Sequence, residues 1–159
     1  MLSQHAPILG SRRVSWPDEA ACQAHARALA SRPALADAYI ELHGPLGAGK
    51  TTFVRHLLRA LGVSGRIKSP TYAVLESYEA LGKPVSHFDF YRFSDPREWQ
   101  DAGFREIFAA PGLKLAEWPE KVGPLLPVAD LRLSIEPVDD EQREVLAEAA
   151  TPRGLELLA

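Results

Sequence analysis

The segment of clearest chemical significance is residues 44–51, which reads GPLGAGKT and matches the pattern G-x-x-x-x-G-K-[ST] at every fixed position. Glycines at 44, 47 and 49 allow backbone N–H groups to converge on an anion, because no Cβ atom intrudes. The Lys50 ammonium can then reach the β- and γ-phosphates of a nucleotide, and the Thr51 hydroxyl can bind Mg²⁺. The segment therefore predicts a site for nucleotide phosphates.

Such a loop must join a strand to a helix, and its neighbours meet that requirement. Residues 38–43 are a short apolar and β-branched run that is typical of a buried strand. After the loop, apolar residues recur at helical spacing until Gly62, and these are Phe53, Val54, Leu57, Leu58 and Leu61. The start of that helix adds partial positive charge beside the loop. The alternative, a chance glycine-rich turn, does not account for these flanks.

Two carboxylates follow at the ends of apolar runs, Asp89 within residues 85–91 and Glu117 within residues 113–118. Ligands of open α/β sheets collect at the carboxyl ends of strands, and a carboxylate there can hold Mg²⁺ beside a phosphate loop. Both residues are therefore candidates for the site. The alternative for Asp89 is that it only caps a turn.

Positive charge gathers around the glycine-rich loop. Residues 42–75 contain no Asp or Glu, but they contain Lys50, Arg55, Arg59, Arg66 and Lys68, although the whole chain has a nominal charge of −3. A locally positive segment in an acidic protein suits a small polyanion better than a long nucleic-acid track.

The overall composition indicates a globular protein. With 159 residues, 46% of them hydrophobic, we expect a single domain over residues 1–159, in which residues 1–12 lack regular structure and a short strand follows at 13–16. The one cysteine, Cys22, cannot form an internal disulfide, which predicts a buried thiol and a reducing compartment. Neither a signal-peptide pattern nor a run of 18 apolar residues is present, so a cytoplasmic protein without membrane association is expected.

The remaining pattern predicts an α/β fold. Residues 72–78 and 85–91 are strands separated by too few residues for a helix, so they should form a hairpin and make the sheet mixed. By period-2 spacing, His87 and Tyr91 would share the strand face of Asp89.

Capping patterns predict two helices. Ser15 and Asp18, with Pro17 between them, are expected to open an alanine-rich helix that Pro33 ends, and residues 95–98 (DPRE) are a capping box that opens a short helix.

The C-terminal part is predicted to be rich in β-structure. Residues 129–136 alternate between apolar and polar, as in a half-exposed strand. Residues 143–150 have helix propensity but stand where a hairpin partner is expected, so both alternatives stay open.

Four stretches together resemble the TsaE family, bacterial P-loop ATPases of threonylcarbamoyladenosine biosynthesis. They are HGPLGAGKTT at 43–52, KSPTY at 68–72, HFDFYRF at 87–93 and EWPE at 117–120, and the resemblance runs from about Trp16 into the tail. The chain departs from the family pattern at Pro45, where a polar or acidic residue is frequent, and at Tyr72 and Phe90, which replace Phe and Leu. None of these positions is a proposed ligand.

The resemblance implies a P-loop fold with flanking helices, ATP and Mg²⁺ as cofactors, and residues 69–71 as a loop that responds to the γ-phosphate. It implies that Lys50, Asp89 and Glu117 are catalytic, with Lys50 at the phosphates, and that Thr51, Asp89 and Glu117 serve Mg²⁺ or the attacking water. With the motif, it assigns nucleotide binding to Gly44, Leu46, Gly47, Ala48, Gly49, Lys50, Thr51, Thr52 and Thr71.

The implied function is an ATPase that assists the TsaD and TsaB proteins in placing a threonylcarbamoyl group on tRNA next to the anticodon. Hydrolysis is expected to be weak for the protein alone and stimulated by its partners, because such loops depend on added transition-state charge. Contact with tRNA is expected only through the complex.

Three other functions compete with this one. A small P-loop kinase would transfer phosphate to a small acceptor, although so short a chain leaves little room for a lid. A GTP-driven switch is disfavoured because the chain has no N-K-x-D sequence and no D-x-x-G after the loop. A non-catalytic adaptor would bind nucleotide only to order a partner surface.

Overall fold

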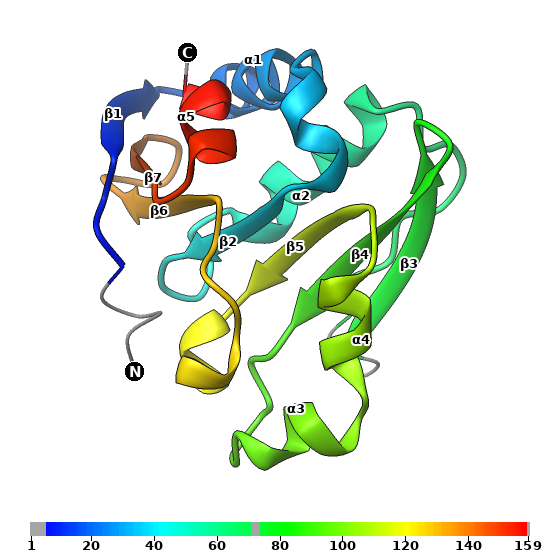
Figure 1. The fold of residues 1–159 in the computed structure, drawn as a ribbon. Coiled ribbons are helices and arrows are strands. Elements are labelled where there is room, and N and C mark those ends of the chain that lie inside the picture. The colour runs from blue at the N-terminus through cyan, green and yellow to red at the C-terminus, as the bar shows by residue number, and fades with distance from the viewer. Residues whose placement is uncertain (1–5, 71–73, 159) are drawn as a thin grey trace.

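A seven-stranded sheet organises the part of the chain that the computed structural model describes, residues 6–70 and 74–158 (Figure 1). Its strands are β1 (Gly10–Trp16), β2 (Tyr39–His43), β3 (Leu75–Ala80), β4 (Lys83–Asp89), β5 (Leu113–Glu117), β6 (Leu131–Pro137) and β7 (Arg143–Ala149). Their spatial order is β1-β7-β6-β2-β5-β4-β3. The neighbours among β6, β2, β5 and β4 are parallel, and the other pairs are antiparallel. The predicted mixed sheet of an α/β fold is confirmed.

Helices cover both faces of this sheet. They are α1 (Glu19–Ala30), α2 (Lys50–Ala60), α3 (Arg97–Asp101), α4 (Phe104–Ala109) and α5 (Pro152–Leu158), with short 3-10 helices η2 (Pro33–Asp37), η3 (Pro119–Lys121) and η4 (Gly123–Leu125). Strand alternation sends Val85 and Leu115 to the core under α1 and α2. It sends Phe88 and Ala116 to a second, aromatic core with α3 and α4. Within residues 6–70 and 74–158, no helix is long and apolar enough to span a membrane.

The predicted hairpin is present as β3 and β4. Leu81 and Gly82 join the two strands, and both have positive φ, 58° and 74°, as a tight two-residue hairpin turn requires. The predicted first strand began at residue 72, and residues 71–73 lie outside the described part of the chain. Strand β4 ends at Asp89, so Tyr91 follows the strand instead of sharing its face.

The N-terminal strand begins earlier than predicted. β1 starts at Gly10, not at Arg13, and pairs with β7 from Gly10 opposite Ala149 to Trp16 opposite Arg143. The prediction of irregular structure up to residue 12 is therefore wrong for residues 10–12. The strand lies at the sheet edge and carries exposed polar side chains, so it has no apolar run that would reveal it.

Helix α1 also begins later than predicted. Its N-cap is Asp18, whose Oδ1 accepts a hydrogen bond from the Ala21 N–H at 2.9 Å. Ser15 belongs to β1, where its hydroxyl donates to Glu144. The helix ends at Ala30, and Pro33 opens η2. The local S-x-x-D pattern was therefore overridden by strand pairing.

Residues 143–149 form a strand, which decides between the two alternatives. This segment pairs antiparallel with β6 and buries every second side chain, those of Val145, Ala147 and Ala149. A helix here would lose both the hydrogen bonds to β6 and this alternating burial, so strand pairing outweighs the helix propensity. The chain then forms α5, which the sequence analysis did not predict. Gly154 allows this helix to approach the Asp130 backbone oxygen, because an added Cβ would lie 1.8 Å from that atom.

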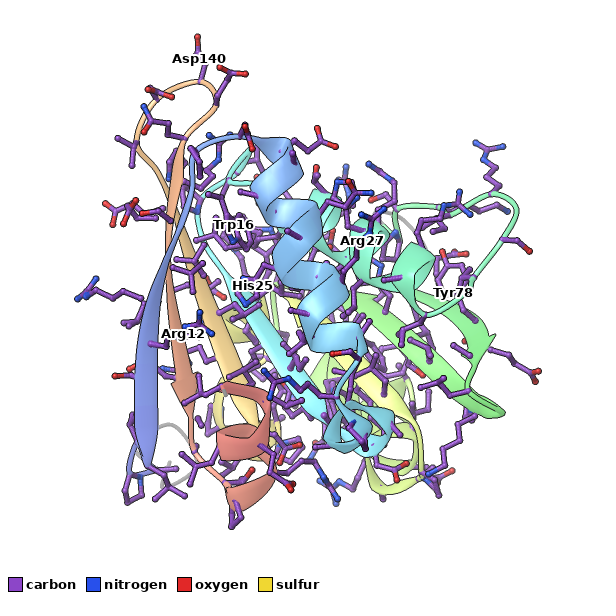
Figure 2. All side chains as sticks on the ribbon, turned by 90° about the horizontal axis from the view of Figure 1, so that it is seen from above. Arg12, Trp16, His25, Arg27, Tyr78 and Asp140 are labelled. Carbon is purple, nitrogen blue, oxygen red and sulfur yellow. The ribbon has the colours of Figure 1, made fainter. Side chains whose placement is uncertain are left out.

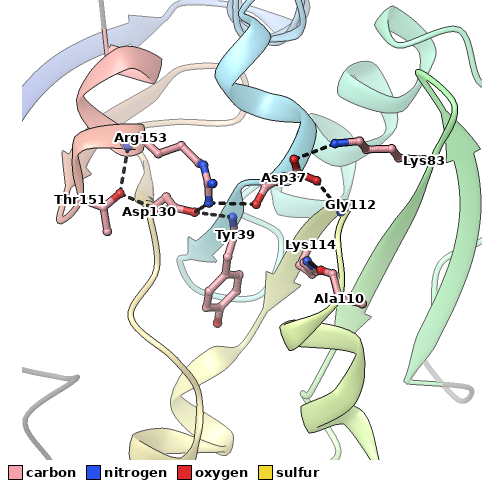
Figure 3. Close-up of polar contacts among 10 residues, drawn as sticks. Asp37, Tyr39, Lys83, Ala110, Gly112, Lys114, Asp130, Thr151 and Arg153 are labelled. Carbon is pink, nitrogen blue, oxygen red and sulfur yellow. Dashed lines mark hydrogen bonds and ion pairs between the residues drawn. The ribbon is translucent and has the colours of Figure 1, made fainter.

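Polar contacts hold the amino ends of the parallel strands together (Figure 3). The Asp37 carboxylate, before β2, accepts from Lys83 Nζ at the start of β4 and from the Gly112 N–H before β5, each at 2.7 Å. Asp130, before β6, accepts from the Tyr39 N–H at 2.8 Å and from the Thr151 hydroxyl at 2.7 Å. These contacts fix the amino ends of the strands, at the end of the sheet away from the glycine-rich loop.

Candidate nucleotide site

The glycine-rich loop leaves β2 and turns directly into α2. Gly47 and Gly49 have φ of 80° and 106°, which L side chains rarely adopt, and an added Cβ at either would enter open space. At Gly44 an added Cβ would lie 2.5 Å from the Ile135 backbone oxygen, so this glycine permits close packing against β6. The loop is thus a backbone cradle that side chains do not fill, as an anion site requires.

Lys50, the first residue of α2, folds back into this loop. Its Nζ donates to the Gly44 oxygen and, at 3.5 Å, to the Pro45 oxygen, and it lies 3.7 Å from the centroid of the Trp118 ring. Burial lowers the Lys50 pKa from its ordinary value, while the nearby carboxylates, Glu117 first, act in the opposite direction. The ammonium therefore lies within the loop that is predicted to bind phosphates.

The two predicted carboxylates come together beside Thr51. Asp89 and Glu117 end the adjacent strands β4 and β5 and are register partners. The Thr51 hydroxyl donates to the Glu117 carboxylate, with distances of 2.9 and 3.0 Å to its two oxygens. Strands β4 and β5 pair in parallel with Asp89 opposite Glu117, and β2 lies alongside β5, which explains why residues distant in sequence meet here.

Asp89 also caps a turn, as the alternative prediction held. Its Oδ1 accepts from the Tyr91 N–H at 2.9 Å. Burial raises the pKa of Asp89 above its ordinary value, the Tyr91 hydrogen bond opposes that rise, and the Glu117 charge adds to it. The capping role leaves the carboxylate at the site, so the two roles coexist.

A cavity of about 360 Å³ lies between the loop and these strand ends. Its lining includes the predicted residues Leu46, Gly47, Ala48, Gly49, Lys50, Thr51, Thr52, Asp89 and Glu117, together with Ser69, Tyr91, Arg92 and Trp118. Gly44 is not part of this lining but packs against Ile135 of β6, and Thr71 is outside the described residues. The sequence analysis thus located most of one connected cavity.

Trp118 forms part of this wall in an unusual conformation. Its φ of 57° lies in the left-handed region, where a bulky residue is strained. This bend turns the chain sharply after Glu117, and the indole packs against Tyr91 with ring centroids 4.9 Å apart. Trp118 belongs to the EWPE stretch at 117–120, but that stretch does not indicate a left-handed backbone at this residue.

A second cavity, of about 210 Å³, adjoins the first at Ala48, Gly49 and Thr52. It continues toward Trp16 at the end of β1 and Asp140 in the β6–β7 loop, which Figure 2 shows beyond the strand ends. The two cavities therefore lie on opposite sides of the loop, the first toward β4 and β5 and the second toward β1 and β7.

Arg143 borders the second cavity and supports the loop. Its Nε donates to the Ala48 oxygen at 2.8 Å, its Nη2 to the Gly47 oxygen at 3.4 Å, and its Nη1 to the Asp139 oxygen at 2.9 Å. The sequence analysis missed this residue because Arg143 and Ala48 are 95 positions apart. No local motif marks such a contact.

The oxygen atoms of Thr51, Asp89 and Glu117 fit a magnesium site only in combination with the phosphates of a nucleotide. In the part of the chain that the structure describes, no three His, Cys, Asp or Glu side chains group to hold a metal ion. Mg²⁺ is commonly bound by one or two carboxylates plus phosphates and water. Thr51, Asp89 and Glu117 beside a phosphate cradle offer that chemistry.

Comparison with known proteins places the chain in a family. The family model described as "Threonylcarbamoyl adenosine biosynthesis protein TsaE" matches residues 16–145. The chain belongs to the TsaE family. The match covers the loop, both carboxylates and the β6–β7 loop of the second cavity, so the described site lies within the part that defines TsaE.

Individual TsaE proteins and a solved structure agree with that assignment. The chain is 43% identical over 110 residues to the tRNA threonylcarbamoyladenosine biosynthesis protein TsaE of Haemophilus influenzae, covering 69% of this chain and 70% of that protein. It is 36% identical over 106 residues to the Bacillus subtilis protein of the same name, covering 67% and 66%. The crystal structure of Bacillus subtilis YdiB superposes with a TM-score of 0.76 at 28% identity, over 93% of this chain and 91% of that one.

Proposed function

We propose that this protein binds ATP with Mg²⁺ and hydrolyses it in support of threonylcarbamoyladenosine formation in tRNA. The observation that carries the proposal is the meeting of Lys50 and Thr51 with Asp89 and Glu117 around one cavity. A phosphate cradle facing two carboxylates is the arrangement that P-loop ATPases use. The pathway follows from the names of the TsaE relatives.

Each residue has a defined task in this proposal. Loop N–H groups of Gly44 and residues 46–52 would bind the phosphate oxygens, and the Lys50 ammonium would exchange its carbonyl partners for the β- and γ-phosphates. Thr51 and Asp89 would hold Mg²⁺ or its water ligands, and Glu117 would hold the metal or orient the attacking water. Bound Mg²⁺ would supply positive charge at the phosphate oxygens where negative charge develops.

The nucleoside would occupy the second cavity. Because Asp89 and Glu117 mark the γ-phosphate side, the other end of the nucleotide must leave the loop in the opposite direction, toward β1 and β7. Trp16 and Thr52 border that space. Competition between ATP and GTP for binding tests whether this cavity selects the base, and equal affinity would argue against a base-selective pocket.

We propose further that turnover is slow for the protein alone and is stimulated by the TsaD and TsaB proteins. Leu46 is 70% exposed and Tyr91 40% exposed at the cavity lining, so apolar side chains are available to a partner beside the phosphates. A partner can accelerate such a reaction by adding transition-state charge. The proposed location is the cytoplasm, where tRNA is modified.

ATP turnover with and without these partners tests the proposal. We expect strong stimulation that disappears in Lys50→Ala. Phosphate transfer to a metabolite instead of water would establish the kinase alternative. Partner assembly that depends on ATP, without any hydrolysis, would establish the adaptor.

A further inference from the structure

A buried histidine contacts the carboxylate at the centre of the site. His87 lies on β4, two residues before Asp89, and strand alternation points both side chains to the same face. Its Nε2 is 2.6 Å from Glu117 Oε2. The two side chains are only 1% and 3% exposed, so solvent does not compete for this contact.

The contact with a carboxylate assigns the donor role to one ring nitrogen of His87. An ionised carboxylate only accepts hydrogen bonds, so Nε2 of His87 is the donor. Its Nδ1 is buried and has no hydrogen-bond partner among the described residues.

Glu117 is thereby held from two sides. The Thr51 hydroxyl donates to the carboxylate from α2, and His87 donates to it from β4. Without the histidine, the Glu117 carboxylate would keep only the contact with Thr51 among its described hydrogen bonds, and the side chain could rotate away from the cavity. His87 itself is absent from the cavity lining, so its influence on bound groups must pass through Glu117.

We propose that His87 is a positioning residue, which holds the Glu117 carboxylate beside Thr51 in the orientation that Mg²⁺ or the attacking water requires. This inference rests on the proposed ATPase function. Groups that orient a metal-site side chain in this way typically contribute about 10- to 100-fold to metal affinity or activity. The competing view is that the pair only stabilises the fold.

The test compares His87→Gln with His87→Asn in the full-length chain. The amide nitrogen of Gln reaches about as far as Nε2 and can donate to Glu117, whereas that of Asn ends near the position of Nδ1 and cannot. Mn²⁺ binding is measured by electron paramagnetic resonance with a non-hydrolysable ATP analogue, and kcat and KM are measured separately. Ser86→Ala is the matched control, because Ser86 is the buried neighbour on the other face of β4.

We expect His87→Asn to weaken Mn²⁺ binding and lower kcat by about 10- to 100-fold, with metal-free nucleotide affinity unchanged. His87→Gln should stay within a few-fold of the native protein. Equal behaviour of the Gln and Asn variants, or a loss confined to the melting temperature, would overturn the inference. A native protein that binds no ATP would overturn the proposed function itself, and this inference with it.

Discussion

Thr51 and Glu117 are 66 positions apart in sequence, yet the Thr51 hydroxyl donates to the Glu117 carboxylate at 2.9 Å. The contact joins the start of α2 to the end of β5, the strand beside β2 in the sheet. Both residues line the cavity between the glycine-rich loop and the ends of β4 and β5. In the proposed complex with nucleotide and Mg²⁺, both residues would share their oxygens with the metal.

Replacing Lys50 by Ala should weaken ATP binding strongly and leave the fold intact. Charged hydrogen bonds contribute about 1.5–3 kcal/mol each, so we expect at least a ~10- to 100-fold loss of affinity by calorimetry. Arg55→Ala is the control, since Arg55 is an exposed cation on the same helix. Unchanged affinity in Lys50→Ala would remove this residue from the site.

Glu117→Gln should separate hydrolysis from binding. The amide keeps the shape and can still contact Thr51, but it cannot act as a base or hold a metal as a carboxylate does. We expect turnover to fall by about 10²- to 10⁴-fold while ATP binding persists. Glu120→Gln is a matched control three residues later, at an exposed carboxylate. Normal turnover in Glu117→Gln would show that another group activates water.

Arg143→Ala should loosen the loop from the β6–β7 side. The variant leaves the Ala48 oxygen without its donor, so we expect ATP affinity to fall by about tenfold. Arg27→Ala, on the exposed side of α1 (Figure 2), should have no effect. Hydrogen exchange at residues 47–49 would report the loosening directly. Native-like exchange and affinity in Arg143→Ala would contradict the supporting role.

Asp37→Asn should lower stability at neutral pH without changing ATP affinity. Hydrogen bonds from Lys83 and the Gly112 N–H depress the pKa of Asp37 in the folded state. A depressed folded pKa stabilises the protein above the unfolded value, about 3.9, and that stabilisation is lost as pH falls through the folded pKa. The carboxylate is partly exposed, so we expect a difference of up to about 1 kcal/mol by urea unfolding. The difference should vanish well below pH 4, and its persistence at the lowest pH would refute the electrostatic cause.

Cys22 should resist thiol reagents in the folded protein. Burial raises the pKa of this thiol to about 12, so little thiolate exists at neutral pH. Titration with a thiol-reactive dye at pH 7.5 should be slow for the native protein and fast in concentrated urea. Rapid labelling of the native protein would show that α1 opens readily.

The sequence indicated those parts of the site that depend on local pattern. The loop, Asp89 and Glu117 lie in motifs of a few residues, and β-strand ends predict where such residues gather. By contrast, the contact of His87 with Glu117 and that of Arg143 with Ala48 depend on strand register, which a single sequence does not contain. The same limit explains β1, whose edge position hides its pairing, and α5, whose close approach to Asp130 depends on a glycine at 154.

The contacts at the amino ends of β2, β4, β5 and β6 have a consequence for how this protein can change. Asp37 and Asp130 hold the amino ends of these strands together, and the cavity lies at their carboxyl ends. Substitutions that adjust thermal tolerance and substitutions that adjust nucleotide handling can therefore accumulate independently. In a lineage that moves to a warmer habitat, substitutions near Asp37 and Asp130 could raise stability while the residues of the cavity stay unchanged.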